Sequence, residues 1–319
     1  MLKKLLVVFV VLAAVAGGLF LLLQNEAAKV DDGSPDPDNA IRVVTTSTMV
    51  TDMVQAIGGE RVSVKGLMGP GVDPHSFQVT PQATAALSKA NIIFYSGLHL
   101  EGKIQDALEK NDKAHAVTSS IPKEKLLKPQ EEFEGHFDPH VWGNPEVWVD
   151  CLDTIVKVLS KEDPEGAEEY EFKAELYYDS LMEMHEWAQK RVAEIPAEQR
   201  VLVTSHDAFF YFGKAYGFQV RGLRGVSTNS EPGLKDRAEL VAFIKEKKLK
   251  MIFPESSVNA KGIKAVAEEA GVKVSEHELF SDAMGKLGDV VELHGESYDK
   301  GTYIGMMKHN INTIVDGLK

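Results

Sequence analysis

The sequence predicts an α/β protein of two Rossmann-like lobes, each built on a parallel sheet, with one long helix between them. Three observations support this fold class. The chain has 319 residues, about twice a common domain size of roughly 150 residues. About six short apolar runs alternate with helical spacings, as in parallel sheets covered on both faces. A long segment near the middle has neither glycine nor proline over most of its length.

The first lobe is predicted over residues 41–162. Residues 41–46 read as a strand, and residues 47–57 have helical apolar spacing closed by two glycines. Residues 62–67 and 91–95 are the next strands. Between them, Thr80 and Pro81 supply an N-cap and a first-turn proline, which predicts a helix from there to about residue 89.

Residues 163–195 are predicted to form one helix about 50 Å long, since each residue adds about 1.5 Å. Its apolar side chains recur in steps of three and four, which predicts one apolar stripe. Such a long stripe packs along a pair of domains or forms a coiled coil, and its position in the middle of the chain favours the pair of domains. The second lobe is predicted over residues 196–319. Its strands are expected at residues 200–205, 219–223, 251–254 and 272–275.

Residues 1–40 read as an export signal or membrane anchor followed by a flexible tether. Lys3 and Lys4 precede an uncharged apolar run over residues 5–23, which is long enough to span a bilayer. Ala14-Val-Ala16 is the cleavage candidate, and an uncleaved anchor competes with cleavage. No cysteine follows the run, which argues against a lipid anchor of the bacterial lipoprotein type. We expect the protein to be exported to the periplasm or the outer face of the cytoplasmic membrane.

Composition narrows the function. The net charge of −13 and the absence of a Lys/Arg stripe argue against nucleic acid as a partner. Cys151 is the single cysteine, so an intrachain disulfide and a thiolate metal cluster are both impossible. We expect its thiol to be buried in a helix.

Three histidines and an aspartate occur in predicted turns or strand-to-helix loops: His75, His140, His206 and Asp282. Ligand sites of open parallel sheets lie beyond the carboxyl ends of strands. Neutral imidazole and carboxylate suit Zn²⁺, Mn²⁺ or Fe²⁺, and four such donors would form a closed binding site rather than a catalytic one. Affinity is expected to fall as the pH drops through the imidazole range near 6.5.

Several ordered motifs resemble the substrate-binding receptors of zinc and manganese ABC importers, the TroA-like group. They are Gly-Val-Asp-Pro-His75-Ser-Phe, His136-Phe-Asp-Pro-His140-Val-Trp, Arg200-Val-Leu-Val-Thr-Ser-His206-Asp-Ala-Phe, Gly225-Val-Ser-Thr, Phe253-Pro-Glu-Ser-Ser and Glu278-Leu-Phe-Ser-Asp282-Ala-Met-Gly. The resemblance covers nearly all of residues 41–319. It implies one metal ion held in a cleft by these four residues, two from each lobe, with the long helix bridging the lobes and limiting closure. It also implies a membrane permease with its own ATPase as partner, and we expect a monomer.

The metal is left open between Zn²⁺ and Mn²⁺. Manganese-dedicated relatives tend to carry Glu at the third position, whereas this chain has His206, which favours zinc. Zinc-specialised relatives often have a His-rich loop between the first two ligands, whereas residues 101–138 contain only His115 and His136. His136 is either an auxiliary ligand or, as we expect, a solvent-facing residue.

Asp207 and Glu255 are candidates for orienting imidazoles, because ligating histidines usually donate their second N–H to a carboxylate or carbonyl. Glu255 could instead replace one of the four candidate ligands.

Two other functions compete. A metal-dependent enzyme is disfavoured because the chain has no His-Glu-x-x-His motif, no Gly-x-Ser-x-Gly elbow and no P-loop. A surface adhesin with a structural metal is the second alternative, because adhesion requires no recognisable motif.

Overall fold

The computed structural model describes residues 40–128 and 135–319. The predicted signal or anchor at residues 5–23 and the tether after it lie outside the described residues. Across the two described ranges, no helix is both long enough and apolar enough to cross a membrane. Residues 41–319 pack as one unit.

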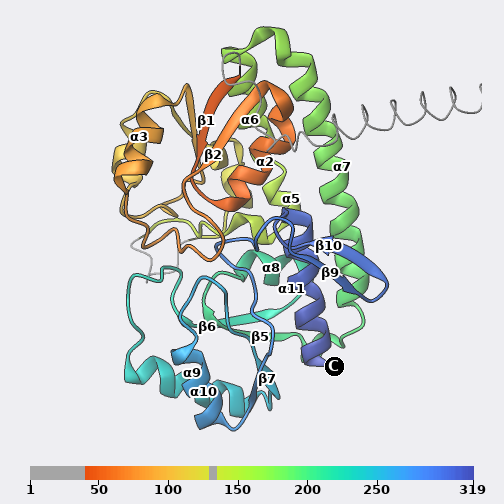
Figure 1. Ribbon diagram of the computed structural model, residues 1–319. Helices are drawn as coiled ribbons and strands as arrows, with labels where there is room; N and C mark the ends of the chain where they lie inside the picture. The colour runs from red at the N-terminus through yellow and green to blue at the C-terminus, as the bar shows by residue number, and fades with distance from the viewer. Residues whose placement is uncertain (1–39, 129–134) are drawn as a thin grey trace, which may run out of the picture. The chain divides into compact units, whose positions relative to one another are not determined.

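The first half contains a parallel sheet of strand order β2-β1-β3-β4, of which Figure 1 labels β1 and β2. Alternate side chains of its strands enter two different cores, because successive residues of a strand point to opposite faces. Val43 and Phe94 face one core, and Val44 and Ile93 face the other. The strands are β1 (Ile41–Thr45), β2 (Val62–Gly66), β3 (Ile92–Tyr95) and β4 (Ala114–Ala116).

Both helices predicted in the first half are present. Thr80 caps the second of them as predicted, since it accepts a hydrogen bond from the Ala83 amide. Ser47, which was predicted as the first residue of the other helix, is its cap and accepts from the Val50 amide. Cys151 is buried at the start of α6, as expected. The helices are α2 (Thr48–Gly58), α3 (Pro81–Lys89), α4 (Gln105–Glu109), α5 (Pro145–Trp148) and α6 (Cys151–Glu162).

The second half has a similar arrangement built on two parallel strand pairs, β5–β6 and β7–β8. A hydrogen bond of 2.9 Å from the Phe253 amide to the Val203 carbonyl connects the two pairs and places β5 beside β7. The four strands are those predicted: β5 (Val201–His206), β6 (Gln219–Arg224), β7 (Met251–Ile252) and β8 (Lys273–Val274).

The remaining elements complete the second half. Its helices are α8 (Phe210–Tyr216), α9 (Leu234–Glu246), α10 (Lys261–Ala270) and α11 (Tyr303–Leu318). An antiparallel hairpin of β9 (Val290–Leu293) and β10 (Glu296–Asp299) was not predicted from the sequence. Neither was β4, which has only three residues.

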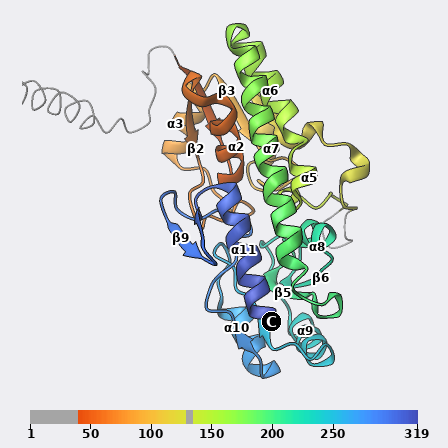
Figure 2. The same cartoon turned by 90° about the vertical axis from the view of Figure 1, so that its right-hand side faces the viewer.

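The long helix is α7 (Ala167–Val192), which is shorter than the predicted 163–195. Asp163 accepts two hydrogen bonds from Arg61 and one from Tyr170, and a 3₁₀ turn over Pro164–Gly166 precedes the helix. The predicted apolar stripe is correct, since Tyr170, Leu181 and most of its other members are buried. Helix α7 packs against α2 and α6 of the first half and against α11 of the second (Figures 1 and 2).

Apolar packing is continuous between the two halves. One core cluster contains Val43 from β1, Leu202 from β5 and Ile314 from α11. The lobe boundaries at residues 162 and 195 therefore stay a prediction, although the similar arrangement of parallel strands in each half agrees with two lobes.

One carboxylate connects three helices of this core. Asp52 of α2 accepts a hydrogen bond of 2.6 Å from the Tyr177 hydroxyl of α7 and another from the backbone N–H of Tyr303 at the start of α11. Burial raises the pKa of Asp52 to about 6, although both hydrogen bonds lower it. The ionised carboxylate is thus less favourable in the folded chain than in the unfolded one.

Replacing Asp52 by Asn should therefore stabilise the protein at pH 8. The loss of folding stability caused by ionised Asp52 is absent below the pKa of the unfolded chain, about 3.9. This loss grows as the pH rises and is complete above the pKa of about 6 in the folded protein. Thermal unfolding should show a higher Tm for Asp52→Asn at pH 8, with the gain shrinking towards pH 4. Asp179→Asn, an exposed change on α7, is the control. A gain that is independent of pH would contradict this account.

Candidate metal centre

The structure brings His75, His140, His206 and Asp282 together in one buried cluster. One ligand atom from each lies within 4.8 Å of every other. All four side chains are at most 1% exposed. The arrangement follows from the topology, because each residue lies at the end of a strand or in the connection that follows one.

Each donor comes from a different segment. His75 lies in the connection from β2 to α3, and His140 directly precedes a 3₁₀ turn over Val141–Gly143. His206 is the last residue of β5. Asp282 follows the isolated bridge between Glu255 and Leu279. Two donors therefore come from each half of the chain.

The spacing of the donor atoms fits a small cation. The His75 and His140 Nε2 atoms are 3.3 Å apart, and Asp282 Oδ1 and Oδ2 lie 3.3 and 3.2 Å from Nε2 of His140 and His206. Tetrahedral ligands at Zn–N distances of 2.0–2.1 Å would be about 3.3 Å apart. Within the described residues, His206 Nε2 and Asp282 Oδ1 are buried without a hydrogen-bond partner. A bound cation would satisfy both atoms.

Two further carboxylates orient the imidazoles. Asp138 Oδ1 accepts hydrogen bonds from the backbone N–H and Nδ1 of His140, at 2.9 and 2.8 Å. Glu255 accepts from the backbone N–H and Nδ1 of His206, at 2.8 and 2.5 Å. Both rings therefore direct Nε2 to the centre, as histidine ligands do when a carboxylate fixes the other nitrogen.

This geometry resolves the alternatives for the neighbouring acidic residues. Glu255 lies against Nδ1 of His206, away from the centre, so it orients a candidate ligand and does not replace one. Asp207 accepts instead from the Gly222 amide at 2.5 Å. The role of Asp138 in orienting His140 was not predicted from the sequence. Its position two residues before His140 could have indicated this role.

His136 has a different setting from the four donors. Its ring centre is 3.5 Å from that of His99, and both side chains are half-buried. Two imidazoles bound to one tetrahedral ion would have ring centres about 5 Å apart, given Zn–N distances near 2.0 Å. The three rings of the cluster are 5.3–6.0 Å apart. The His99 and His136 rings therefore contact each other, tilted by 36°, in a geometry that does not suit a shared ion.

Three other histidines have packing or surface roles. His185 contacts the Tyr216 hydroxyl at 3.0 Å, His309 the Glu278 carbonyl at 3.0 Å, and His294 the Asp316 carboxylate at 2.8 Å.

Buried charge sets the protonation of the cluster. Burial lowers the pKa of His75 to about 4. Burial also favours a neutral His140, but Asp138 and Asp282 outweigh it and raise the pKa of His140 to about 9. Burial likewise lowers the pKa of His206, but Asp282 and Glu255 outweigh this effect and raise the pKa well above its ordinary value. Although burial raises the pKa of Asp282, the neighbouring imidazoles hold it well below its ordinary value.

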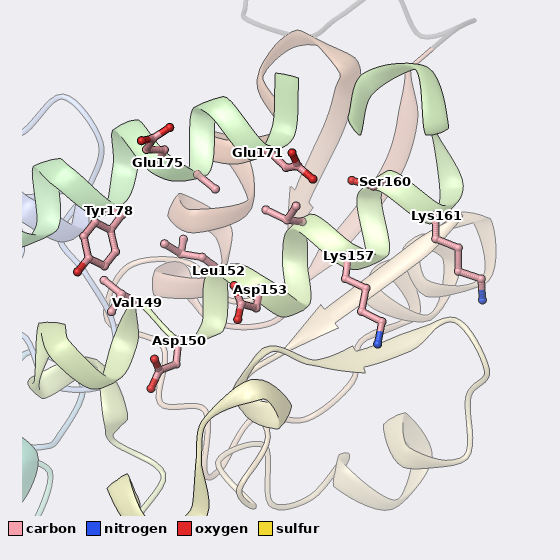
Figure 3. Close-up of a pocket in the computed structure, with 12 residues that line it drawn as sticks. Val149, Asp150, Leu152, Asp153, Lys157, Ser160, Lys161, Glu171, Glu175 and Tyr178 are labelled. Carbon is pink, nitrogen blue, oxygen red and sulfur yellow. The ribbon is translucent and has the colours of Figure 1, made fainter. Parts of the chain in front are cut away.

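A surface groove of about 780 Å³ lies elsewhere, between α6 and α7. Glu171 and Glu175 line the groove from α7, and Lys157 and Lys161 line it from α6. The two lysine side chains extend away from α7 (Figure 3). None of the four clustered residues borders this groove.

Comparison with known proteins gives a consistent picture. Residues 43–317 match the family model described as ZnuA, zinc-uptake complex component A, periplasmic. The chain is 42% identical to the manganese-binding lipoprotein MntA of Bacillus subtilis, over 95% of this chain and 98% of MntA. It is 40% identical to the zinc-binding protein TroA of Treponema pallidum, over 90% of this chain and 92% of TroA.

The solved structure of the periplasmic zinc-binding protein TroA from Treponema pallidum superposes with a TM-score of 0.81. The match has 40% identity and covers 88% of this chain and 99% of TroA. The predicted fold class is therefore confirmed.

The orienting carboxylates should matter for metal affinity. Asp138→Asn and Glu255→Gln should each weaken Zn²⁺ binding by about 10–100-fold, because the imidazoles lose their fixed orientation and basicity. Titration calorimetry or chelator competition would measure this loss. The exposed Glu278→Gln is the matched control. Asp282→Ala removes a direct donor and should cost more, so equal losses for Glu255→Gln and Asp282→Ala would contradict the assigned roles.

Proposed function

This chain belongs to the ZnuA family of zinc-uptake components, and on that premise we propose that it is an exported receptor for a divalent transition metal. It binds one Zn²⁺ or Mn²⁺ through His75, His140, His206 and Asp282, and delivers the ion to an ABC-type importer. The observation that carries this function is the buried convergence of the four donors at spacings that a small cation would bridge.

Binding is an exchange of protons for metal. Before a cation arrives, His140 and His206 hold protons beside the ionised Asp282. An incoming metal ion replaces these protons, and its positive charge then neutralises the buried carboxylate of Asp282. Asp138 and Glu255 stay on the outer nitrogens, so Nε2 of each ring remains directed at the ion.

The donor set supports both metals. Three imidazoles favour Zn²⁺, whereas carboxylate oxygen suits Mn²⁺. The two oxygens of Asp282 face different imidazoles, so five donor atoms surround the centre. This agrees with relatives of similar identity that are named for manganese and for zinc.

The partner is a membrane permease, which is the component that substrate-binding proteins of ABC importers serve. We further propose that the receptor is monomeric and that residues 5–23 deliver it across the membrane and can anchor it. A relative of 42% identity is named a lipoprotein, whereas the single cysteine of this chain, Cys151, lies in α6 and does not directly follow residues 5–23.

Transport is favoured over catalysis by the closed donor set. Catalytic zinc sites usually keep one position for water, with three protein ligands. Here four buried residues face the centre. The adhesin alternative has no specific structural support.

Metal binding should release about two protons per ion at pH 7, because His140 and His206 are protonated and His75 is neutral before binding. Affinity should keep rising with pH up to the His140 pKa of about 9, a higher window than the sequence-based value near 6.5. Calorimetry in buffers of different ionisation enthalpy would count the protons. Asp138→Asn should reduce the number, and no proton release in the native protein would refute the exchange.

Metal preference can be tested at His206. A His206→Glu change places a second carboxylate beside Glu255, so the informative variant combines it with Glu255→Gln. We expect its preference for Zn²⁺ over Mn²⁺ to fall by about tenfold or more, since an imidazole is exchanged for oxygen. Competition between the two ions, read by metal analysis, measures the ratio, with Glu255→Gln as control. An unchanged ratio would exclude His206 as a determinant of selectivity.

A further inference from the structure

The donor cluster is enclosed, so an ion can enter or leave only if contacts around it open. His140 and His206 are fully buried, and His75 and Asp282 are 1% exposed. The contacts between the two halves therefore decide how the ion is kept. The contacts between the two halves differ in how deeply their residues are buried.

Some of these contacts belong to the apolar core. The Trp142 indole N–H donates to the Ser281 carbonyl at 2.8 Å, and the Tyr303 hydroxyl donates to the Trp142 carbonyl at 2.6 Å. Trp142 and Tyr303 are 3% and 0% exposed and belong to the main core cluster. Breaking these contacts would require the core to separate.

A contact of another kind lies closer to solvent. The Thr228 hydroxyl of the second half donates to Asp73 Oδ2 of the first half at 2.6 Å, and both residues are half-buried. The other oxygen of the same carboxylate, Oδ1, accepts from the backbone N–H of His75 at 2.9 Å. One side chain thus connects a metal-binding loop to the opposite half.

Backbone packing places the same loops together. A side-chain carbon at Gly102 would lie 3.2 Å from the His75 carbonyl and 3.6 Å from the Asn229 amide nitrogen. A side-chain carbon at Gly71 would lie 3.6 Å from the Ser256 carbonyl. The loop that carries Thr228 therefore lies beside the segments around His75.

We propose that the Asp73–Thr228 hydrogen bond is a latch over the metal site that sets how fast the ion dissociates. The inference rests on the proposed metal-binding function. A hydrogen bond from a hydroxyl to a carboxylate is stronger than one between two neutral groups. At this half-buried position, water can nevertheless replace either partner without disturbing the core. When it breaks, the His75 loop loses its side-chain hydrogen bond to the opposite half, and the site can open there. Thr228 is a positioning residue and contributes no ligand atom.

The test is the dissociation rate of Zn²⁺ from the loaded protein, followed by stopped-flow mixing with excess chelator. Thr228→Val keeps the side-chain shape and removes the donor. It should release the ion about tenfold faster or more, the size expected for losing a hydrogen bond to a charged acceptor. Thr228→Ser restores the hydroxyl and should release the ion at nearly the native rate.

Ser76→Ala is the matched control, because the Ser76 hydroxyl donates to the same Asp73 Oδ2 at 2.9 Å from within the His75 loop. It should leave the rate unchanged. An unchanged rate in Thr228→Val, or equal acceleration in Ser76→Ala, would overturn the latch. Failure of the native protein to bind one ion per chain would instead overturn the proposed function, so the two outcomes are distinguishable.

Discussion

The buried carboxylate of Asp282, between the imidazoles of His140 and His206, is the interaction on which the rest of the site depends. An ionised carboxylate removed from water is costly unless a positive group accompanies it. In this chain the positive charge is a proton on an imidazole, and the proposed divalent ion would take the same place. Because His140 belongs to the first half and Asp282 to the second, the charge balance also ties the two halves together.

The similar arrangement of the two halves explains how four distant residues meet. Each half contains parallel strands, and the donors emerge where strands end, so strand ends from both halves supply one centre. Each half also places a carboxylate behind one imidazole. In the first half this carboxylate is Asp138, two residues before its histidine, whereas Glu255 approaches His206 from 49 positions away.

Much of this could be predicted because the signals are local. The apolar strands, the Thr80 cap and the four candidate donors are all readable over a few residues. Strand β4 could not be predicted in this way, because Ala114–Ala116 is short and has the polar His115 at its centre. The hairpin β9–β10 was missed because its first strand is largely exposed and lacks a continuous apolar run. The chain just before α7 is held by Arg61, which hydrogen-bonds Asp163 and is distant in the sequence. The convergence of the donors was inferred from family resemblance, since distances between loops depend on how the sheets pack.

Helix α7 has a consequence for how an importer distinguishes a loaded receptor from an empty one. It packs against helices of both halves, and a continuous apolar core accompanies it. Large hinge rotations would break this packing, so the two states should share nearly the same backbone. We therefore expect recognition by the importer to depend on how long the metal site stays closed. Docking would favour receptors whose site remains closed for the time that docking takes. The importer would then read a kinetic property of the receptor, not a second shape.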